Sequence, residues 1–344
     1  MCTHTVKGKI RNSIISIGDH TELADKLAIP GDAIYITDDN LAEIYSEFLA
    51  DKKTIMVENG EKNKNLTTMD MIYDKLIEMG ADRRSFIIGF GGGVVTDIAG
   101  FAASTYMRGI KFGFIPTSLL AMVDASIGGK NGVNHRMYKN MIGNINQPEF
   151  VLIDSYFLNT LPDDEYINGM AEAIKHLLIA DKKGFEHYAE NTGSFLDKKG
   201  KEISSFLCSQ TKIKVDIVNR DERESGERKK LNFGHTFGHA IEKLSGMKHG
   251  FAVSTGMVIA AKISHKLGFL SSKDVETIKT TLVKTGLPVN FELPTNKIME
   301  TMYKDKKKHG DNIDFIALEQ IGKAKIIPMK IEELKELFVE ILIN

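Results

Sequence analysis

The residues best suited to chemistry in this chain are three histidines within fifteen positions: His235, His239 and His249. His235 and His239 are four residues apart, so on a helix they share one face. His249 follows a predicted turn around Gly246 and could fold back onto that face. Neutral imidazoles are ligands that suit zinc or a related divalent metal. With an added carboxylate, the pattern predicts a three-ligand metal site with an open position, which favours an enzyme over a binding module.

A histidine pair on a helix is, however, more often a packed core pair or a surface pair than a metal site. The third histidine and the neighbouring glycines favour the metal. Gly234 and Gly238 are each about 1 kcal/mol less favourable than alanine inside a helix. Their presence therefore predicts that another part of the molecule approaches this helix closely.

A glycine-rich segment, residues 89–97 with the sequence GFGGGVVTD, follows a predicted strand and opens a helix predicted to end near Thr105. Backbone N–H groups at a helix N-terminus bind anions, and glycines let a pyrophosphate approach closely. The segment is not the G-x-G-x-x-G fingerprint, because Thr96 stands where the last glycine would be. A glycine run can be a tight turn only, but the strand before and the helix after favour phosphate binding. Residues 61–64 (EKNK) could supply charge to the same cofactor.

Polar groups between Asp124 and Asn140 could recognise an anionic, hydroxyl-rich small molecule. The segment 124–130 (DASIGGK) is followed by Asn134 and by the pair Lys139 and Asn140. The alternative is that these residues belong to a solvated loop. For Lys139 taken by itself, we favour that alternative.

Two further stretches carry charged residues. Glu172 and Lys175 are three residues apart on a predicted helix, where a surface ion pair would be the ordinary explanation. Lys214 and Arg228 precede the histidine cluster. The charged run 220–230 is also typical of a solvated loop.

The elements that must position these residues change character along the chain. Residues 32–37, 53–57, 85–89 and 111–115 read as strands, and 41–49 as a helix. Another helix is predicted with Thr67 and Asp70 as a capping box and Gly80 as its stop. This alternation predicts a parallel α/β sheet of nucleotide-binding type. After about residue 154, helical spacing prevails at 164–179, 201–218, 232–244 and 252–267, with a hairpin at 313–318 and 323–327. We therefore predict an α/β domain at 1–155 and a mainly α-helical domain at 156–344.

Bulk properties exclude several classes. A chain of 344 residues with 42% hydrophobic and 26% charged residues is typical of a globular protein with two domains or one large one. The net charge of −1 gives no reason to expect nucleic-acid or membrane binding. Cys2 and Cys208 lie far apart and outside any C-x-x-C, so a cytoplasmic location is expected. Residues 1–11 lack the apolar core of a signal peptide, and no run of about 18 apolar residues occurs.

Several motifs occur together and in order between about residues 38 and 327. They are GGGVVTDIAGF at 91–101, YMRG at 106–109, IPTSLL at 115–120, VDASIGGK at 123–130, KNMIG at 139–143, QP at 147–148, TLP at 160–162, AEAIK at 171–175 and LNFGHTFGHA at 231–240. In this combination the chain resembles the 3-dehydroquinate synthase family of sugar phosphate cyclases. The resemblance implies an N-terminal Rossmann-like NAD-binding domain and a C-terminal domain that binds metal and substrate.

The resemblance implies that zinc or cobalt is bound by Glu172, His235 and His249, in place of the pairing of His235 with His239 that the helical spacing favours. His239 is then expected to face substrate and phosphate chemistry. NAD is implied at one aromatic and ten other positions: Asp38, Asn40, Glu61, Lys64, Gly93, Asp97, Thr117, Ser118, Lys139, Phe157 and Thr160.

The implied substrate is 3-deoxy-D-arabino-heptulosonate 7-phosphate, and the implied product is 3-dehydroquinate. The reaction belongs to the shikimate pathway, which leads to the aromatic amino acids. The implied reaction sequence is transient oxidation of the substrate by NAD, phosphate elimination, re-reduction by NADH, ring opening and aldol closure. Arg108 is expected to reach the phosphate across a homodimer interface, and Lys306 or Lys307 to contact phosphate as well. Catalytic or substrate contacts are implied at Asp124, Lys130, Asn140, Lys175, Lys214, Arg228, Asn232 and His239.

Two departures from the family pattern stand out: Thr96 replaces a glycine, and Met137-Tyr138 replaces the more usual Leu-Gly.

Three other functions stay compatible with the sequence. A related cyclase could act on sedoheptulose 7-phosphate, glucose 6-phosphate or an amino analogue, although Arg228, Asn232 and Lys214 favour a substrate with a carboxylate. A metal-dependent alcohol or glycerol dehydrogenase would release NADH, which a cyclase does not. A non-catalytic NAD-binding module would have no need of the metal and lysine sets.

Overall fold

The computed structural model describes residues 1–136, 138–198, 200, 202–306 and 312–343, without the side chains of 304–306 and 343. The chain divides into two compact units. The first comprises Met1–Pro162 and Lys201–Arg223, and the second comprises Asp163–Gly200 and Glu224–Asn344. Helix α9 (Glu202–Arg220) therefore clusters with the first unit, although it lies in the range for which a mainly helical domain is predicted.

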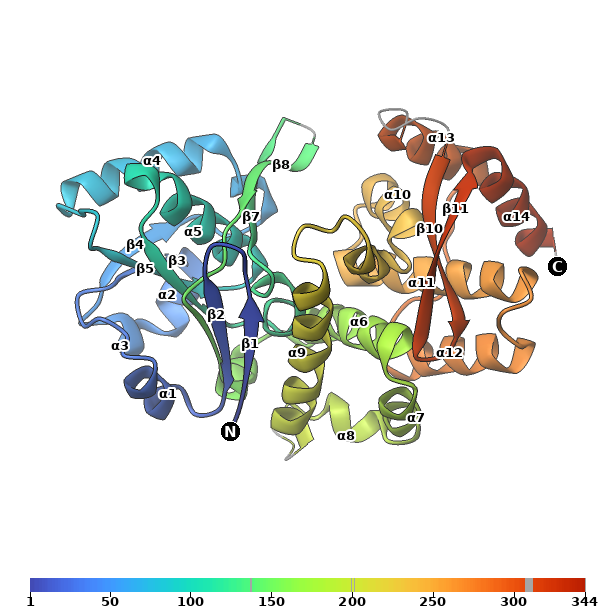
Figure 1. The fold of residues 1–344 in the computed structure, drawn as a ribbon, viewed down its shortest axis with the longest axis horizontal. Helices are drawn as coiled ribbons and strands as arrows, with labels where there is room; N and C mark the ends of the chain where they lie inside the picture. The colour runs from blue at the N-terminus through green and yellow to red at the C-terminus, as the bar shows by residue number, and fades with distance from the viewer. Residues whose placement is uncertain (137, 199, 201, 307–311, 344) are drawn as a thin grey trace. The chain divides into compact units, whose positions relative to one another are not determined.

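A seven-stranded sheet forms the centre of the first unit, in the order β1-β2-β9-β6-β5-β3-β4 (Figure 1). From β2 to β4 all the described pairings are parallel, and β1 joins β2 antiparallel. The predicted parallel sheet is thus confirmed. The strands span Cys2–Lys7 (β1), Asn12–Ile17 (β2), Ile34–Asp38 (β3), Lys53–Val57 (β4), Phe86–Gly91 (β5), Lys111–Pro116 (β6) and Phe150–Ile153 (β9).

The helices of this unit follow the strands as βαβ units require. The predicted helix at 41–49 is broken at Tyr45 into two short helices. The predicted capping box at Thr67 is wrong, because the Asn65 side chain accepts the Thr68 amide and caps α4. The helical segments are His20–Lys26 (α1), Asp39–Ile44 (α2), Ser46–Leu49 (α3), Glu61–Asn63 (η1), Leu66–Glu78 (α4), Gly93–Thr105 (α5), Tyr106–Arg108 (η2), Ala121–Ala125 (η3) and Ser155–Thr160 (η4).

Two additions to this core matter for the site. A hairpin of Lys130–His135 (β7) and Tyr138–Ile145 (β8) packs against α5 through β7. Helix α9 packs against β1 and β2, as Figure 1 shows. A disulfide joins Cys2 of β1 to Cys208 of α9, a pairing that the cysteine spacing did not indicate.

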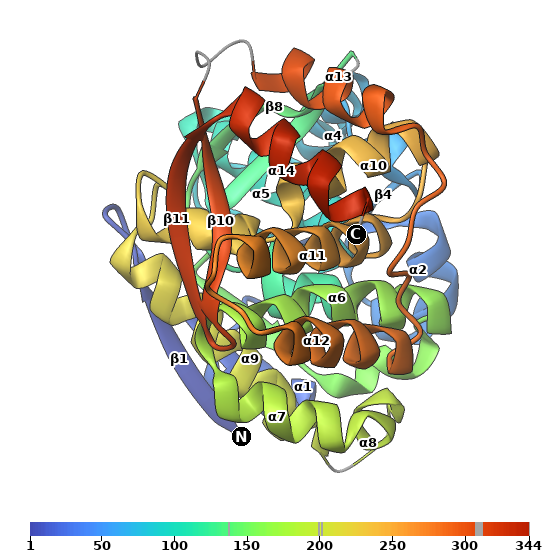
Figure 2. The same cartoon turned by 90° about the vertical axis from the view of Figure 1, so that its right-hand side faces the viewer.

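The second unit is mainly helical, as predicted, and is organised around α11 (His249–Lys266). This helix is buried along most of its length and packs against α6, α10, α12 and the β10 strand (Figure 2). The predicted hairpin is confirmed as β10 (Asn312–Gln320) and β11 (Lys323–Lys330). The remaining segments are Asp163–Ala180 (α6), Lys182–Glu190 (α7), Thr192–Leu196 (α8), Glu227–Asn232 (η5), His235–Ser245 (α10), Ser272–Lys284 (α12), Thr295–Lys306 (α13) and Ile331–Ile343 (α14).

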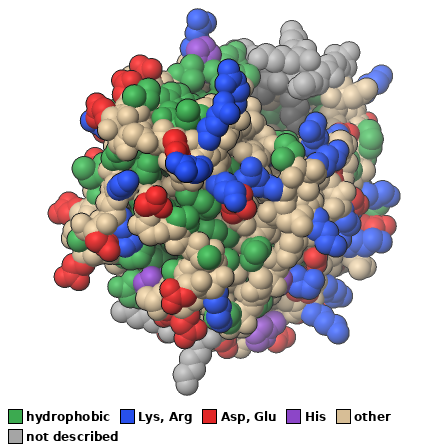
Figure 3. Space-filling model, turned by 60° about the vertical axis from the view of Figure 1, so that its left-hand side comes forward, with side chains coloured by type: hydrophobic (Ala, Val, Ile, Leu, Met, Phe, Trp, Pro, Cys, Tyr) green, Lys and Arg blue, Asp and Glu red, His purple; other side chains and the backbone are tan. Residues whose placement is uncertain are grey.

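Basic and acidic side chains are interspersed on the face that Figure 3 presents, in keeping with the net charge of −1. Within the described ranges, none of the helices combines the length and the hydropathy that a bilayer-spanning segment needs.

The close approach predicted at Gly234 and Gly238 is confirmed, and its partner is α11. A Cβ at Gly238 would lie 3.1 Å from the Val253 Cα, and a Cβ at Gly256 would lie 2.0 Å from the Gly234 carbonyl oxygen. The two helices therefore meet backbone to backbone, and the neighbours at Gly256 are too rigid to move aside.

We expect Gly256→Ala to lower the free energy of unfolding by about 3 kcal/mol, because the added methyl group must displace backbone. Gly193→Ala is the matched control: Gly193 lies in α8 and a Cβ there meets nothing within 4 Å. The control should leave stability unchanged or raise it slightly. Urea unfolding followed by circular dichroism measures both, and equal stability of the two variants would contradict the backbone contact.

Candidate active site

The residues predicted to bind NAD follow the carboxyl ends of neighbouring parallel strands in the first unit. Asp38 closes β3, and Glu61 follows β4. Gly93 and Thr117 follow β5 and β6, and Phe157 follows β9. Parallel strands present their carboxyl ends at one edge of a sheet, and this edge is where open α/β sheets bind their ligands.

The N-terminus of α5 is suited to an anion. Its N-cap is Gly92, which supplies no side-chain cap, and its first turn holds no acidic residue. Gly91 is required by close packing, since a Cβ there would lie 2.6 Å from the Val95 Cβ. The departure at Thr96 is accommodated inside the helix, because its buried hydroxyl donates to the Gly93 carbonyl at 3.1 Å. The first-turn amides can thus face a phosphate without a competing side chain.

A buried lysine organises the polar groups at this edge. Lys64 is 4% exposed, pairs with Asp97 and donates to the Asn140 Oδ1 at 2.5 Å. Burial raises the pKa of Asp97 to about 6, although the Lys64 charge acts in the opposite direction. Asn134 holds the hairpin in place by donating to the Glu61 carboxylate at 2.8 Å and accepting the Asn140 amide at 2.8 Å. Asn140 adopts a positive φ of 51° at this point.

The other predicted NAD residues differ in exposure. Phe157 is 1% exposed and lies within an aromatic cluster with Tyr45 and Phe90, at ring distances of 5.4 and 5.3 Å. The Thr160 hydroxyl lies 2.6 Å from the Tyr45 hydroxyl. Ser118 is half-buried beside Gly92, while Asn40 and Lys139 are exposed. Phe157 therefore shapes the wall behind the strand ends, and direct contact with NAD stays a prediction.

Besides Asn140, four of the predicted substrate groups belong to the first unit. Asp124 lies on η3, a π-helical turn, and pairs with the buried Lys214 of α9. Irregular turns of this kind are frequent at functional sites. Lys130 is exposed at the start of β7, and Arg108 is exposed on η2 with a φ of 68°.

The second unit gathers a carboxylate and two histidines from three helices. Glu172 of α6 is 1% exposed, and its Oε1 lies 3.6 Å from the His235 Nε2 and 3.3 Å from the His249 Nε2. Lys175, also buried, forms an ion pair with Glu172. The surface ion pair expected as the ordinary explanation is therefore wrong, because both groups point into the interior of the helical unit.

Each histidine is held so that its Nε2 faces the carboxylate. The His235 Nδ1 lies 3.3 Å from the Phe233 carbonyl oxygen, which can only accept a hydrogen bond. The His249 Nδ1 lies 3.0 Å from the Glu242 carboxylate. Nδ1 is then a donor in both rings, and Nε2 is the atom that each ring can offer to a metal. Together with Glu172 this is a nitrogen and oxygen donor set that suits zinc or cobalt, with room for a further ligand.

The electrostatics of the two rings differ. Burial, followed by the charge of Lys175, holds the pKa of His235 well below its usual value. Burial also acts to lower the pKa of His249, but its hydrogen bonds to Glu172 and Glu242 outweigh it and raise the pKa to about 9. His235 is thus ready to act as a neutral ligand, whereas His249 loses a proton when its Nε2 binds a cation.

Next to this cluster is a cavity of about 230 Å³, lined by Asn232, His235, Thr236 and His239 among others. His239 is exposed, and its ring centroid lies 5.0 Å from that of His235. His239 thus faces open space beside the three-residue cluster.

The structure of the charged run 220–230 differs from the sequence-based prediction in two ways. Arg228 is 2% exposed on η5, so the solvated loop expected for the run 220–230 is wrong at this residue. Glu224 accepts from the Asn232 Nδ2 at 2.6 Å, and sequence reasoning missed it. A single acidic residue in a charged run carries no distinguishing signal. The side chains of Lys306 and Lys307, of which one is predicted to contact phosphate, lie outside the described residues. Met137, one of the departures from the family pattern, also lies outside them.

Two family models together match most of the chain. Residues 54–168 match the family described as 3-dehydroquinate synthase N-terminal, and residues 169–308 match 3-dehydroquinate synthase C-terminal. The 3-dehydroquinate synthase of Campylobacter hominis is 43% identical over 311 residues, which cover 88% of this chain and 89% of the relative.

The chain belongs to the 3-dehydroquinate synthase family. Its fold is shared with solved structures of sugar phosphate cyclases. A 2-deoxy-scyllo-inosose synthase, complexed with carbaglucose-6-phosphate, NAD⁺ and Co²⁺, matches with a TM-score of 0.86 and 27% identity, over 98% of this chain and 100% of that chain. A 2-epi-5-epi-valiolone synthase from Streptomyces hygroscopicus subsp. jinggangensis, with NAD⁺ and Zn²⁺ bound, matches with a TM-score of 0.84 and 25% identity, over 95% and 96% of the two chains.

For this member of the 3-dehydroquinate synthase family, Glu242→Gln should weaken zinc binding by about 10-fold or more, because the charge that orients His249 is lost. Competition with a chromophoric chelator measures the dissociation constant. Glu276→Gln, on the exposed surface of α12, is the control and should bind zinc as the unchanged protein does. Equal affinity in both variants would contradict an orienting role for Glu242.

The raised pKa of Asp97 also has a measurable effect on stability. Since its value in the fold, about 6, lies above the ordinary 3.8, the folded state binds this proton more tightly than the unfolded chain. The stabilisation is complete below about pH 4 and is lost as the pH rises to about 6. Urea unfolding without NAD should show this decline relative to Asp97→Asn, followed by a constant difference at higher pH. A difference that does not change with pH would rule the shift out.

Proposed function

We propose that this chain acts as a 3-dehydroquinate synthase, a lyase that converts 3-deoxy-D-arabino-heptulosonate 7-phosphate into 3-dehydroquinate and phosphate. The convergence of Glu172, His235 and His249 on one point in the second unit carries the proposal, in a chain that is 43% identical to a relative of that name. The strand-end edge of the first unit supplies the second requirement, a place for a dinucleotide.

The cofactors we infer are NAD and a divalent metal, Zn²⁺ or Co²⁺. Solved cyclases of the same fold are described with NAD⁺ together with Co²⁺ or Zn²⁺. In this chain the open N-terminus of α5 fits the pyrophosphate, and Glu172, His235 and His249 would hold the metal. When bound, NAD accepts and returns a hydride, and the metal polarises a substrate oxygen as a Lewis acid.

The protein's own side chains then bind and orient the substrate. Lys175 stands beside the metal ligands, where its charge favours oxygens that become negative. The buried Arg228 is suited to a carboxylate, which it can bind with two parallel hydrogen bonds. Asn232, held by Glu224, can donate to substrate hydroxyls. Holding both ends of the substrate in register supplies orientation, the contribution that a multistep reaction on one surface needs most.

Phosphate chemistry is assigned to the exposed His239, and further substrate contacts to groups of the first unit. His239 lines the cavity beside the metal ligands, and we assign it proton transfer near the phosphate. Asp124 pairs with the buried Lys214 and holds it in place, and Lys130 and Asn140 add donors from the hairpin. Lys64, which pairs with Asp97, also donates to Asn140 and so fixes this end of β8.

We further propose that the protein is a homodimer and that it is cytoplasmic. The dimer is supported by the exposed pair Met107 and Arg108, both at positive φ on η2, which projects a cation outward. In a dimer that cation can reach the phosphate bound by the partner copy. The location is supported by the use of a nucleotide cofactor and a sugar phosphate.

The test is phosphate release from 3-deoxy-D-arabino-heptulosonate 7-phosphate by purified protein with NAD and zinc or cobalt. We expect release in proportion to substrate, loss of release with a chelator, and no accumulation of NADH by absorbance. Glucose 6-phosphate and sedoheptulose 7-phosphate serve as comparison substrates and should give little or none. Glu172→Gln should lose both metal and turnover, because a neutral amide is a poorer ligand for a divalent cation.

Outcomes that would exclude the proposal are equally direct. No phosphate release from protein that still binds NAD and metal would remove the substrate assignment. Net NADH formation would indicate a dehydrogenase. Unchanged metal content in Glu172→Gln would remove Glu172 from the ligand set.

A further inference from the structure

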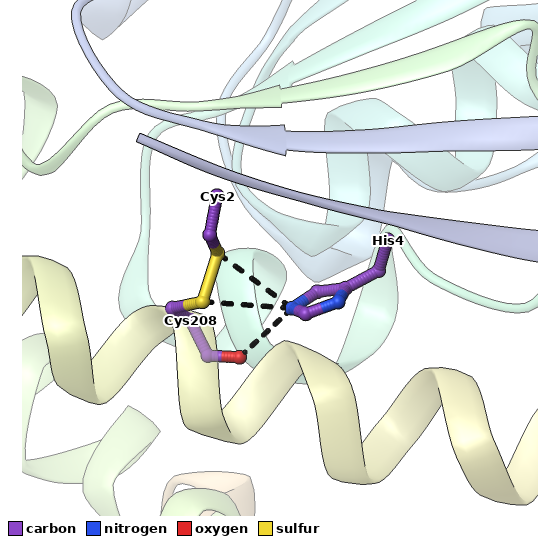
Figure 4. A group of neighbouring side chains, drawn as sticks. All are labelled: Cys2, His4 and Cys208. Atoms are coloured by element: carbon purple, nitrogen blue, oxygen red, sulfur yellow. Dashed lines mark hydrogen bonds between the residues drawn. A yellow bond between two sulfur atoms is a disulfide. The ribbon is translucent and has the colours of Figure 1, made fainter.

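A second cluster of potential metal-binding side chains lies in the first unit, and none of its residues is assigned a role above. Cys2 and His4 project from β1, and Cys208 projects from α9 (Figure 4). The two sulfurs form a disulfide, and the His4 Nε2 lies 3.6 Å from each of them. All three residues are half-buried, so reductants and ions can reach them.

The local structure explains why these groups meet. Cys2 and His4 are two residues apart on a strand, so their side chains point to the same face of the sheet. That face packs against α9, which presents Cys208. Asn219 of α9 ties the same strand independently, since it accepts the Lys7 amide at 2.7 Å and donates to the Thr5 carbonyl at 3.0 Å. Breaking the disulfide therefore leaves the strand, the helix and the three side chains in register.

The distances match those of a tetrahedral zinc site. Zinc bonds of about 2.3 Å to sulfur and about 2.0 Å to nitrogen place a sulfur and a nitrogen ligand roughly 3.6 Å apart. The two nitrogen–sulfur distances already have this value. Two sulfurs on one zinc lie roughly 3.8 Å apart. The Cα atoms of Cys2 and Cys208 are 6.3 Å apart, so side-chain rotation alone can open the sulfurs to that spacing.

We propose that Cys2, His4 and Cys208 form a redox-controlled zinc site: a disulfide when oxidised, and a two-thiolate, one-imidazole site for a thiophilic divalent cation when reduced. A dithiol reductant supplies two electrons and two protons, the sulfur–sulfur bond breaks, and the reductant forms its own disulfide. Zinc then binds both sulfurs and displaces the two thiol protons to solvent. The fourth position is left to water.

His4 changes its role between the two states. In the disulfide state its Nε2 donates to the Cys208 carbonyl oxygen at 3.1 Å. In the zinc state the ring carries its proton on Nδ1 and the Nε2 lone pair binds the metal. The Cys208 carbonyl keeps a donor, because the Thr211 hydroxyl lies 3.0 Å from it. The change therefore leaves no backbone acceptor without a partner.

This site would connect β1 to α9 in either redox state. Helix α9 also carries Lys214, so the same connection steadies a residue that we assign to the substrate. In a reducing compartment zinc would take over the role that the disulfide has under oxidising conditions.

The experiment measures how much added zinc binds to metal-stripped protein, either in the oxidised state or after treatment with a phosphine reductant. That reagent becomes a phosphine oxide with oxygen from water and does not supply competing thiols. We expect one more equivalent of bound zinc per chain in the reduced protein than in the oxidised protein. Cobalt gives an independent signature: thiolate-to-cobalt charge-transfer absorption in the near ultraviolet should develop only after reduction, and the Glu172 cluster has no sulfur that could cause it.

The variants separate this site from the proposed active site. Cys2→Ser, Cys208→Ser and His4→Asn should lose the extra equivalent, whereas His187→Asn, on α7 of the other unit, should keep it. His235→Ala with His249→Ala should still gain one equivalent on reduction, so failure of the active-site proposal would not affect this result. Equal zinc content in the two redox states would overturn the proposal. So would reduction-dependent cobalt absorption that persists in Cys2→Ser and Cys208→Ser.

Discussion

The carboxylate of Glu172 is buried in the helical unit, where an unpaired negative charge would cost several kcal/mol. This constraint dictates what surrounds it. Lys175 supplies a cation one turn along α6, and His235 and His249 bring ring nitrogens from α10 and α11. Helices α10 and α11 can deliver both rings to one point only because they meet backbone to backbone at glycines. The packing of the unit and its chemistry therefore have the same origin.

In the first unit the corresponding constraint is the buried ammonium group of Lys64. It draws Asp97 of α5 and Asn140 of β8 toward it, and so links the helix after β5 to a hairpin that is not part of the main sheet. A cofactor-binding edge built only from strand ends would lack this connection. The lysine thus joins the two parts of the unit that are predicted to contact NAD and substrate.

Much of the fold could be predicted from the sequence, because local spacing determines it. Apolar runs bounded by turn residues identified the parallel strands β3, β4, β5 and β6 but not β2 and β9, and helical periodicity identified α6, α10 and α11. What the spacing could not show depends on tertiary burial. The segment containing Arg228 resembles a solvated loop in composition, yet the side chain is 2% exposed. Glu242 and Glu224 are ordinary acidic residues until their partners, His249 and Asn232, are known. Asn65 and Thr67 are both good caps, and only the observed backbone decides between them.

The membership of α9 in the first unit has a consequence for how the chain is made. Synthesis completes the strands of the sheet first, passes through α6, α7 and α8, and only then produces the helix that covers β1 and β2. During translation the N-terminal hairpin therefore waits, with one face bare, for a segment some two hundred residues later. The first unit cannot mature as an independent N-terminal module, and its last step overlaps the growth of the second unit.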